Sequence, residues 1–269
     1  MKRQKIAHFF WLSVQKIGIL SATFYKLQFL FYTAISNLGI DLKGKKFSLY
    51  IKGIKCPIYW RCGTSDNFVF DQIFINEEYS GISNIENVNW IVDCGANVGY
   101  SAIYLLNKYP QARVIAIEPD SHNFELCSIN LAPYGNRACV IKSAIWSEKT
   151  GLVLERLSED NGEWGIQVRP CKVGETPDLD ATSIKSIFED FDIDIVDILK
   201  IDIETAEWQV FSRNYQEWLN KVRYIAIELH TQECRKVFFK ALSSLKYDSW
   251  NSEELTFCKI DSSSVSISN

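Results

Sequence analysis

The sequence predicts an α/β fold in which helices cover both faces of a mostly parallel sheet. From Trp90 onward, strand-like apolar runs alternate with helical segments, a pattern typical of parallel sheets with helical crossovers. A glycine-containing turn joins the first run to its helix, and an acidic residue ends the second run. The predicted strands are 90–94, 113–118, 138–142, 195–201, 222–228 and one near 255–260, and the clearest helices are 100–109, 123–131 and 234–245.

The turn after the first strand is predicted to bind a ligand. Gly95 and Gly99 bracket it, at positions where a Cβ would keep a ligand away from the backbone. The amide groups that open the following helix, at its positive dipole end, would face the ligand. The second strand ends in Glu118, 23 residues after Gly95. A carboxylate at that point is placed to accept both hydroxyls of a ribose, so an adenosine-containing cofactor is expected.

The spacing of the turn distinguishes between cofactors. A dinucleotide fingerprint requires glycine at the first, third and sixth positions, where this chain has Gly95, Asn97 and Tyr100. Asp93 would also place negative charge beside a pyrophosphate. An acidic residue at the start of the turn suits a cationic ligand, so S-adenosylmethionine is favoured. The alternatives are a nucleotide-dependent oxidoreductase and a turn whose glycines serve folding alone.

Charge is distributed unevenly along the chain. The whole chain has 269 residues, 47% hydrophobic composition and a net charge of −4. Residues 1–46 contain eight Lys or Arg and one acid, Asp41, a surplus of seven positive charges, so residues 47–269 carry −11. An acidic catalytic body argues against nucleic acid as the partner, because binding a polyanion requires a basic face.

The eight cysteines are predicted to be reduced thiols of a cytoplasmic protein. They form no C-x-x-C pair and no zinc-binding spacing. Several fall inside predicted strands or helices, where a free cysteine behaves as a small apolar residue. No metal site is expected from them.

The amino-terminal segment 1–46 is predicted to be a basic, apolar helical extension. Its longest uncharged run, 27–40, is too short to span a bilayer. One interpretation is that its apolar stripe packs on the chain's own domain or on a twin; the other is that it lies on an anionic membrane surface. The stripe recurs at helical spacing and consists of Ile17, Leu20, Phe24, Leu27, Phe31, Ile35 and Leu38.

Three regions are predicted: the extension 1–46, a catalytic domain 47–261 and a polar tail 262–269. Residues 47–60 alternate as strands do, and 66–79 is predicted to be a helix capped by Ser65 or Asp66. Residues 151–178 are polar and interrupt the alternation, with a hairpin signal at Asn161-Gly162. Trp164 beside it is a candidate for the acceptor-binding wall, although a tryptophan there could equally pack as a core lid.

Five ordered stretches resemble the FkbM-type methyltransferases, a family of S-adenosylmethionine-dependent O-methyltransferases. The stretches are GTSDNFVFDQIF…EEY (63–79), VDCGANVGYSA (92–102), IAIEPD (115–120), DILKIDIETAE (197–207) and IELH (227–230). One departure stands out: the family usually has glycine where this chain has Thr205. A β-branched residue there would restrict the backbone. An alternative function is therefore a non-catalytic adapter that retains the methyltransferase fold.

The resemblance implies a doubly wound sheet of seven strands in the order 3-2-1-4-5-7-6, with strand 7 antiparallel. The cofactor would lie across the carboxyl ends of strands 1 and 2. By this likeness Asp93 and Gly95 would face the methionine portion, Glu118 the ribose, and Ser143 and Ala144 the adenine. The full set of expected cofactor-binding residues is Asp93, Gly95, Ala96, Asn97, Gly99, Glu118, Ser143 and Ala144.

The resemblance also implies an acceptor hydroxyl on a sugar, a glycolipid or another small natural product. Such a hydroxyl needs a general base or a metal ion. Residues two apart in a strand share a side, so Asp202 and Glu204 can point into one crevice, as can Glu228 and His230. His230 is predicted to be the base, with Asp202 and Glu204 positioning the acceptor. The alternatives are that His230 only caps a helix or bonds a carboxylate, and that Asp202, Glu204 and His230 form a metal cage.

Overall fold

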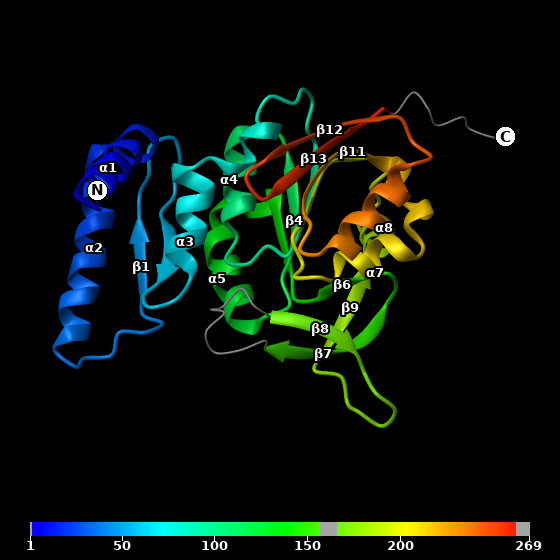
Figure 1. Cartoon of the computed structure of the whole chain (residues 1–269), viewed down its shortest axis with the longest axis horizontal. Coiled ribbons are helices and arrows are strands. Elements are labelled where there is room, and N and C mark those ends of the chain that lie inside the picture. Colours follow the sequence, from blue (N-terminus) through cyan, green and yellow to red (C-terminus); the bar gives the residue numbers. More distant parts are fainter. Residues whose placement is uncertain (1, 157–165, 262–269) are drawn as a thin grey trace.

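The computed structural model describes residues 2–156 and 166–261. Its centre is a seven-stranded sheet in the order β12-β13-β11-β10-β3-β4-β5 (Figure 1). β3, β4, β5, β10 and β11 are parallel, whereas β13 is antiparallel to both β11 and β12. This confirms the predicted order 3-2-1-4-5-7-6. The strands are β3 (Trp90–Cys94), β4 (Arg113–Ile117), β5 (Ala138–Ile141), β10 (Val196–Ile201), β11 (Val222–Glu228), β12 (Tyr247–Ser252) and β13 (Leu255–Ile260).

Helices cover both faces of this sheet because its central strands are apolar on both sides. Ile91 and Ile198 belong to one core cluster, which includes residues of α4 (Tyr100–Lys108) and α5 (Ser121–Leu131). Val92 and Leu199, each one residue further along, belong to the opposite cluster. That cluster includes residues of α6 (Ile184–Asp190), α7 (Glu207–Ser212) and α8 (Gln232–Leu242). Successive side chains of a strand point to opposite faces, so two cores form.

A second sheet of four strands follows β5 in the chain, in the order β6-β9-β7-β8. The strands are β6 (Ala144–Trp146), β7 (Thr150–Arg156), β8 (Ile166–Pro170) and β9 (Leu179–Ser183). The polar composition of 151–178 did not predict this sheet, although β7 and β8 pair antiparallel as a hairpin does. Asn161, Gly162 and Trp164 lie outside the described residues, as does the tail 262–269.

The segment in front of the sheet differs from its prediction. The continuous helix expected over 66–79 is wrong: the chain forms α3 (Asp66–Phe70), the π-helical η1 (Asp71–Ile75) and the 3₁₀-helical η2 (Glu78–Ile82). Glu77 ends the helical path because its φ of 52° is left-handed. Before it, β1 (Lys46–Leu49) and β2 (Ile58–Arg61) pair antiparallel. The remaining short 3₁₀ turns are η3 (Ala132–Arg137), η5 (Tyr215–Glu217) and η6 (Leu219–Lys221).

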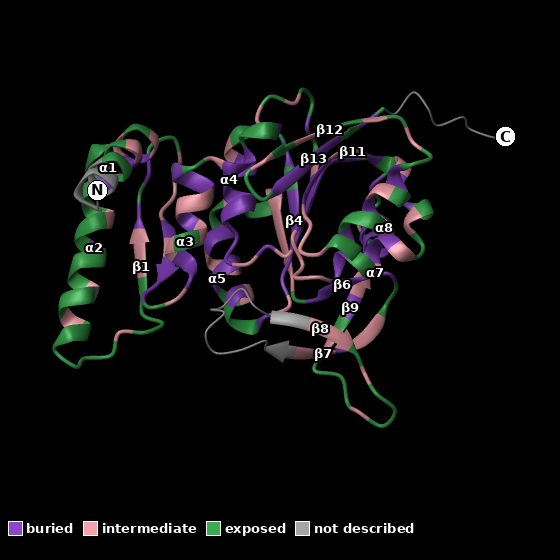
Figure 2. Cartoon of the chain, in the orientation of Figure 1, coloured by how far each residue is buried: buried purple, intermediate pink, exposed green. Residues whose placement is uncertain are grey.

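Two helices form the amino-terminal segment, α1 (Lys2–Ile17) and α2 (Ile19–Asn37), and they break at Gly18 with φ 91°. Ile17 is buried, but Leu20 and Leu38 are 83% and 74% exposed. The interpretation that the whole stripe packs on the chain's own body is therefore wrong for most of α2, which Figure 2 shows largely exposed. Within the described ranges, no helix combines the length and apolarity needed to cross a bilayer.

Candidate functional site

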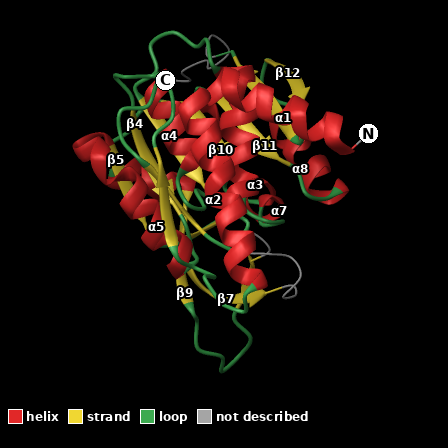
Figure 3. Cartoon of the chain, turned by 90° about the vertical axis from the view of Figure 1, so that its left-hand side faces the viewer, coloured by secondary structure: helices red, strands yellow, loops and turns green. Residues whose placement is uncertain are grey.

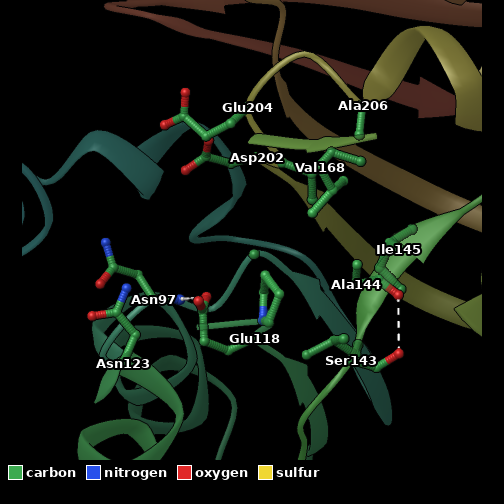
Figure 4. Close-up of a pocket in the computed structure, with 14 residues that line it drawn as sticks. Asn97, Glu118, Asn123, Ser143, Ala144, Ile145, Val168, Asp202, Glu204 and Ala206 are labelled. Atoms are coloured by element: carbon green, nitrogen blue, oxygen red, sulfur yellow. Dashed lines mark hydrogen bonds between the residues drawn. The ribbon is translucent and has the colours of Figure 1, made fainter. Parts of the chain in front are cut away.

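Two cavities open at the carboxyl ends of the central strands. The first has a volume of about 620 Å³ and contains five of the residues predicted to bind the cofactor (Figure 4). The other residues around this cavity are mostly apolar, and of these only Asp202 and Glu204 were singled out from the sequence. The cavity is lined by Gly95, Asn97, Ile117, Glu118, Pro119, Asn123, Ser143, Ala144, Ile145, Val168, Asp202, Ile203, Glu204 and Ala206.

Gly95 is required by the chain's own backbone. Its φ is +79°, and a Cβ there would lie 1.8 Å from the carbonyl oxygen of Asp202. The turn after β3 is thus pressed against the end of β10, which explains the glycine without any ligand. Gly99 has φ +88°, and its Cβ would lie 3.1 Å from Cys127 Sγ on α5. Gly99 therefore brings α4 close to α5 and lines neither cavity.

Glu118 stands at the centre of the first cavity, as predicted from its place after β4. One carboxylate oxygen accepts the backbone N–H of Asn97 at 2.8 Å (Figure 4). The other accepts the backbone N–H of Asp120 at 3.0 Å. Burial raises the pKa of Glu118 to about 7, although these two bonds oppose the rise. Each oxygen retains a lone pair, so both can accept a hydroxyl from the cavity.

The far wall of the first cavity is formed by the start of β6. The Ser143 hydroxyl donates to the carbonyl of Asp180 at 2.8 Å, so its side chain is already engaged. Ala144, Ile145 and Val168 add an apolar surface that suits a planar base. Asn123 lines the opposite side, in the first turn of α5. In the sequence, the residue that could have placed Asn123 was Asp120, the N-cap of α5. Its carboxylate accepts the backbone N–H of Asn123 at 3.0 Å.

Asp93 does not face either cavity, contrary to the prediction. Its buried carboxylate accepts the Ser101 hydroxyl at 2.5 Å and lies 3.2 Å from Lys200 Nζ. Burial alone would lower the pKa of Lys200, but neighbouring charges including Asp93 and Asp202 raise it well above the usual value. Lys200 also donates to the carbonyl of Gly95. Asp93 therefore holds a buried lysine under the turn.

The second cavity, of about 1190 Å³, adjoins the first and is more acidic. Four residues line both: Gly95, Asn97, Asp202 and Glu204. Ala96, predicted to bind the cofactor, lines only this second cavity. The complete lining is Val69, Gln72, Ile73, Glu78, Tyr79, Gly95, Ala96, Asn97, Tyr100, Ser101, Lys200, Asp202, Glu204, Glu228, His230, Glu254 and Leu255.

His230 lies at the end of β11, where four carboxylates surround its ring. Nδ1 lies 3.0 Å from Oε1 of Glu207, a fully buried residue that also accepts the N–H of Ile203. Glu207 therefore ties the loop after β10 to the end of β11. On the other side, Nε2 lies 3.7 Å from Asp202, 3.7 Å from Glu204 and 3.5 Å from Glu228.

The electrostatics of this cluster contradict the premise that made His230 the base. Burial by itself lowers the pKa of His230, but the hydrogen bond and charge of Glu207, with the charges of Glu228 and Asp202, raise it to about 9. The imidazole is therefore protonated at neutral pH and has no free site for a proton. Burial raises the pKa of Glu204 and of Glu228 to about 7, which is suited to general-base catalysis at neutral pH.

The loop that carries Glu204 has an unusual backbone. Glu204 and Thr205 have φ values of 50° and 78°, both left-handed. This accounts for the glycine that the resemblance led us to expect at position 205, since only glycine adopts such a φ without strain. The two residues turn the chain away from β10, and Glu204 remains on the wall that the cavities share.

One group of side chains in the described residues has the spacing of a metal site. Ligand atoms of Asp202, Glu228 and His230 all lie within 4.8 Å of one another. The predicted cage contained Glu204 in place of Glu228. Binding a cation here would require His230 to lose a proton, because only neutral imidazole coordinates a metal.

Comparison with known proteins identifies the family. Residues 93–248 match the Methyltransferase FkbM domain. The chain belongs to this family. Methyltransferase sdnD of Sordaria araneosa is 40% identical over 65 residues, which are 24% of this chain and 25% of that protein. AMB antimetabolite synthetase AmbE of Pseudomonas aeruginosa is 25% identical over 199 residues, 61% of this chain and 9% of that protein.

The matched segments cover 25% and 9% of these relatives, so the chain spans a quarter or less of the length of the curated proteins it matches. Among solved structures, the methyltransferase FkbM from Methylobacillus flagellatus KT has 18% identity and a TM-score of 0.46. That comparison covers 67% of this chain and 45% of the other. The FkbM assignment therefore rests on the domain match over 93–248.

Proposed function

We propose that this FkbM-family protein transfers a methyl group from S-adenosylmethionine to a hydroxyl of a sugar, a glycolipid or another small natural product. The observation that carries the proposal is the pair of adjoining cavities with Gly95, Asn97, Asp202 and Glu204 in common. A cofactor in one cavity and an acceptor in the other would meet at these residues. Methyl transfer requires this arrangement, because the acceptor oxygen must approach directly behind the methyl group.

The first cavity fits S-adenosylmethionine. Glu118 would accept the two ribose hydroxyls, while Ala144, Ile145 and Val168 would contact the adenine. The carboxylates of Asp202 and Glu204 would lie on the side of the cationic methionine portion. When bound, the cofactor supplies an electrophilic methyl group on a sulfonium. The acidic lining favours this cation over a dinucleotide pyrophosphate, which it would repel.

The second cavity suits a hydroxyl-rich acceptor. Glu78, Glu228, Glu254 and Lys200 are hydrogen-bonding groups around its wall. Such groups orient a polar ligand and reject an apolar one. As the acceptor oxygen attacks, the oxygen–carbon bond forms, the carbon–sulfur bond breaks, and the hydroxyl proton must leave.

Glu204 is the residue assigned to take this proton. It lies on the wall between the two cavities, and its pKa of about 7 leaves a large fraction unprotonated at neutral pH. Protonated His230, 3.7 Å from Glu204 and from Asp202, holds these carboxylates in place. His230 is thus a positioning residue in this mechanism, and the proton passes from the acceptor to a carboxylate.

Calorimetric titration with S-adenosylmethionine and with NAD tests the cofactor. We expect binding of S-adenosylmethionine alone, and Glu118→Ala should weaken it about tenfold or more because charge-assisted bonds are worth about 1.5–3 kcal/mol each. Glu254→Ala, which changes a carboxylate of the second cavity only, is the matched control and should bind the cofactor as the wild type does. Binding of NAD alone would make the protein an oxidoreductase.

The catalytic assignment is tested by turnover of S-adenosylmethionine with extracted glycans and glycolipids, with mass spectrometry to detect an added methyl group. Glu204→Gln should lower kcat by about a hundredfold or more while sparing cofactor affinity. EDTA should leave the wild-type rate unchanged. Loss of activity in EDTA would mean that a metal ion bound by Asp202, Glu228 and His230 activates the acceptor, in place of a carboxylate base. Cofactor binding without turnover of any acceptor would favour the adapter.

A further inference from the structure

The exposed apolar side chains of this protein are concentrated at one end. Of the 16 large apolar side chains that are exposed in the described residues, 11 lie between Phe9 and Ile40. Six of them follow one side of α2 and its end, and we call them the apolar face. The apolar face consists of Leu20, Phe24, Leu27, Leu30, Phe31 and Leu38, each more than half exposed. Contiguous apolar surface on this scale marks an interaction site.

The apolar face points outward because the other side of α2 is anchored to the body. Gln28 is buried, donates to the carbonyl of Ser48 at 3.1 Å and accepts the Trp60 indole N–H at 3.2 Å. The Tyr25 hydroxyl donates to Asp71 Oδ1 at 3.2 Å. These buried polar bonds set the rotation of the helix about its axis. Turning the apolar face inward would break the bonds that Gln28 makes with Ser48 and Trp60.

α1 and α2 lie together at one end of the molecule, away from β12 and α8 (Figure 1). Figure 3 looks onto this end and shows both helices across it. α1 contributes Trp11, which is 62% exposed, to the same end. The arrangement presents the sides of two helices, as an element lying in the plane of an interface would.

The charges around the apolar face indicate what covers it. α2 itself has a single charged residue, Lys26. Basic residues lie on both sides of it in the chain: Lys2, Arg3 and Lys5 open α1, and Lys43, Lys45 and Lys46 follow α2. The only acid in residues 1–46 is Asp41. An apolar strip with lysines on both sides of it in the chain complements an anionic bilayer surface, whereas two copies of this segment would bring like charges together.

We propose that α1 and α2 dock the protein on the surface of an anionic membrane, with the apolar face inserted at the headgroup boundary and the lysines on the lipid phosphates. This inference does not depend on the methyl-transfer proposal. Docking through α2 would also affect the second cavity, proposed to hold the acceptor. The Tyr25 hydroxyl of α2 bonds to the segment that contributes Val69, Gln72 and Ile73 to that cavity. Docking would hold that cavity near the bilayer, where a lipid-linked acceptor would be found.

Sedimentation of the full chain with phosphatidylcholine vesicles, with and without phosphatidylglycerol, tests the docking. The wild type should bind the anionic vesicles and release at high salt. The double variant Leu27→Glu/Phe31→Glu should bind about tenfold or more weakly, because it removes two inserted side chains and adds repelled charge. Both side chains are about half exposed, so the fold should survive, and an unchanged melting temperature checks this.

The matched control is Val173→Glu/Ile195→Glu, which adds the same charge at exposed apolar positions far along the chain and should bind as the wild type does. Light scattering in solution completes the experiment. A stable dimer that Leu27→Glu/Phe31→Glu dissociates, without vesicle binding, would overturn the proposal in favour of a second copy. Equal binding of the wild type and the double variant would overturn the proposal, because the lysines alone would then account for vesicle binding.

Discussion

Single residues set the geometry on which the proposed chemistry depends, and Thr205 is the one under most strain. Its φ of 78° costs a non-glycine residue roughly 1–2 kcal/mol. Glycine would remove that cost, although a more flexible unfolded chain offsets part of it. We expect Thr205→Gly to raise the free energy of unfolding by about 1 kcal/mol, as measured by urea denaturation.

Thr205→Ala is the control for this prediction, because alanine keeps the Cβ and loses only the branch. It should gain much less than glycine. A glycine variant no more stable than the wild type would mean that the Thr205 side chain makes stabilising contacts that exceed its backbone strain. If activity also rises in Thr205→Gly, the strain limits turnover as well as stability, because Glu204 precedes this residue.

At the scale of elements, a buried ion pair joins three segments around the first cavity. Asp66, at the start of α3, accepts the Arg61 side chain of β2 at 2.7 Å and 2.9 Å. Arg61 also donates to Asn123 of α5 at 2.7 Å, and Asn123 lines the first cavity. Asp66 is therefore not the helix cap considered from the sequence. It fixes the position of a cavity wall through Arg61.

Asp66→Ala should lower the free energy of unfolding by about 3–5 kcal/mol, because it leaves the Arg61 charge buried without its carboxylate. Chemical denaturation measures this. The control is Asp190→Ala, which breaks an exposed pair with Lys149 at 3.4 Å and should cost about 0.5 kcal/mol or less. Equal effects of the two variants would mean that water reaches Arg61 and that the pair contributes little.

At the scale of the whole molecule, stability should fall as pH rises. Burial raises the pKa of five carboxyl groups to about 7, so the folded state binds more protons than the unfolded state between about pH 4.5 and 7. Stability from these groups is lost as pH rises through 7. His230, with a pKa raised to about 9, loses its contribution as pH rises through 9. The five groups are Asp71, Glu78, Glu118, Glu204 and Glu228.

We therefore expect the melting temperature, measured by calorimetry at constant ionic strength, to be higher near pH 5 than near pH 8. Glu78→Gln should flatten this dependence because it removes one of the titrating groups. Glu189→Gln, an exposed change on α6, should leave it as in the wild type. A melting temperature that rises from pH 5 to pH 8 would mean that these carboxyls ionise in the folded state at their ordinary pKa.

Local sequence pattern was sufficient for six of the seven strands of the central sheet and for much of the first cavity. β3, β4, β5, β10, β11 and β13 follow apolar runs, and an apolar run needs no distant partner to be recognised, whereas the polar β12 has no such run. Glu118 could be placed for the same reason, since its position depends only on β4, the strand that precedes it. The strand order came from five motifs in a fixed sequence order, which carry the topology of a known family.

Tertiary structure decided the properties that arise from several elements at once. The protonation of His230 depends on Glu207, Glu228 and Asp202, which come from α7, β11 and the loop after β10, so its ordinary pKa was a poor guide. The outward face of α2 was set by Gln28 and Trp60, two partners 32 residues apart. The apolar stripe of α2 revealed its helical period, but the period alone is the same whether that stripe meets a core, a twin or a membrane.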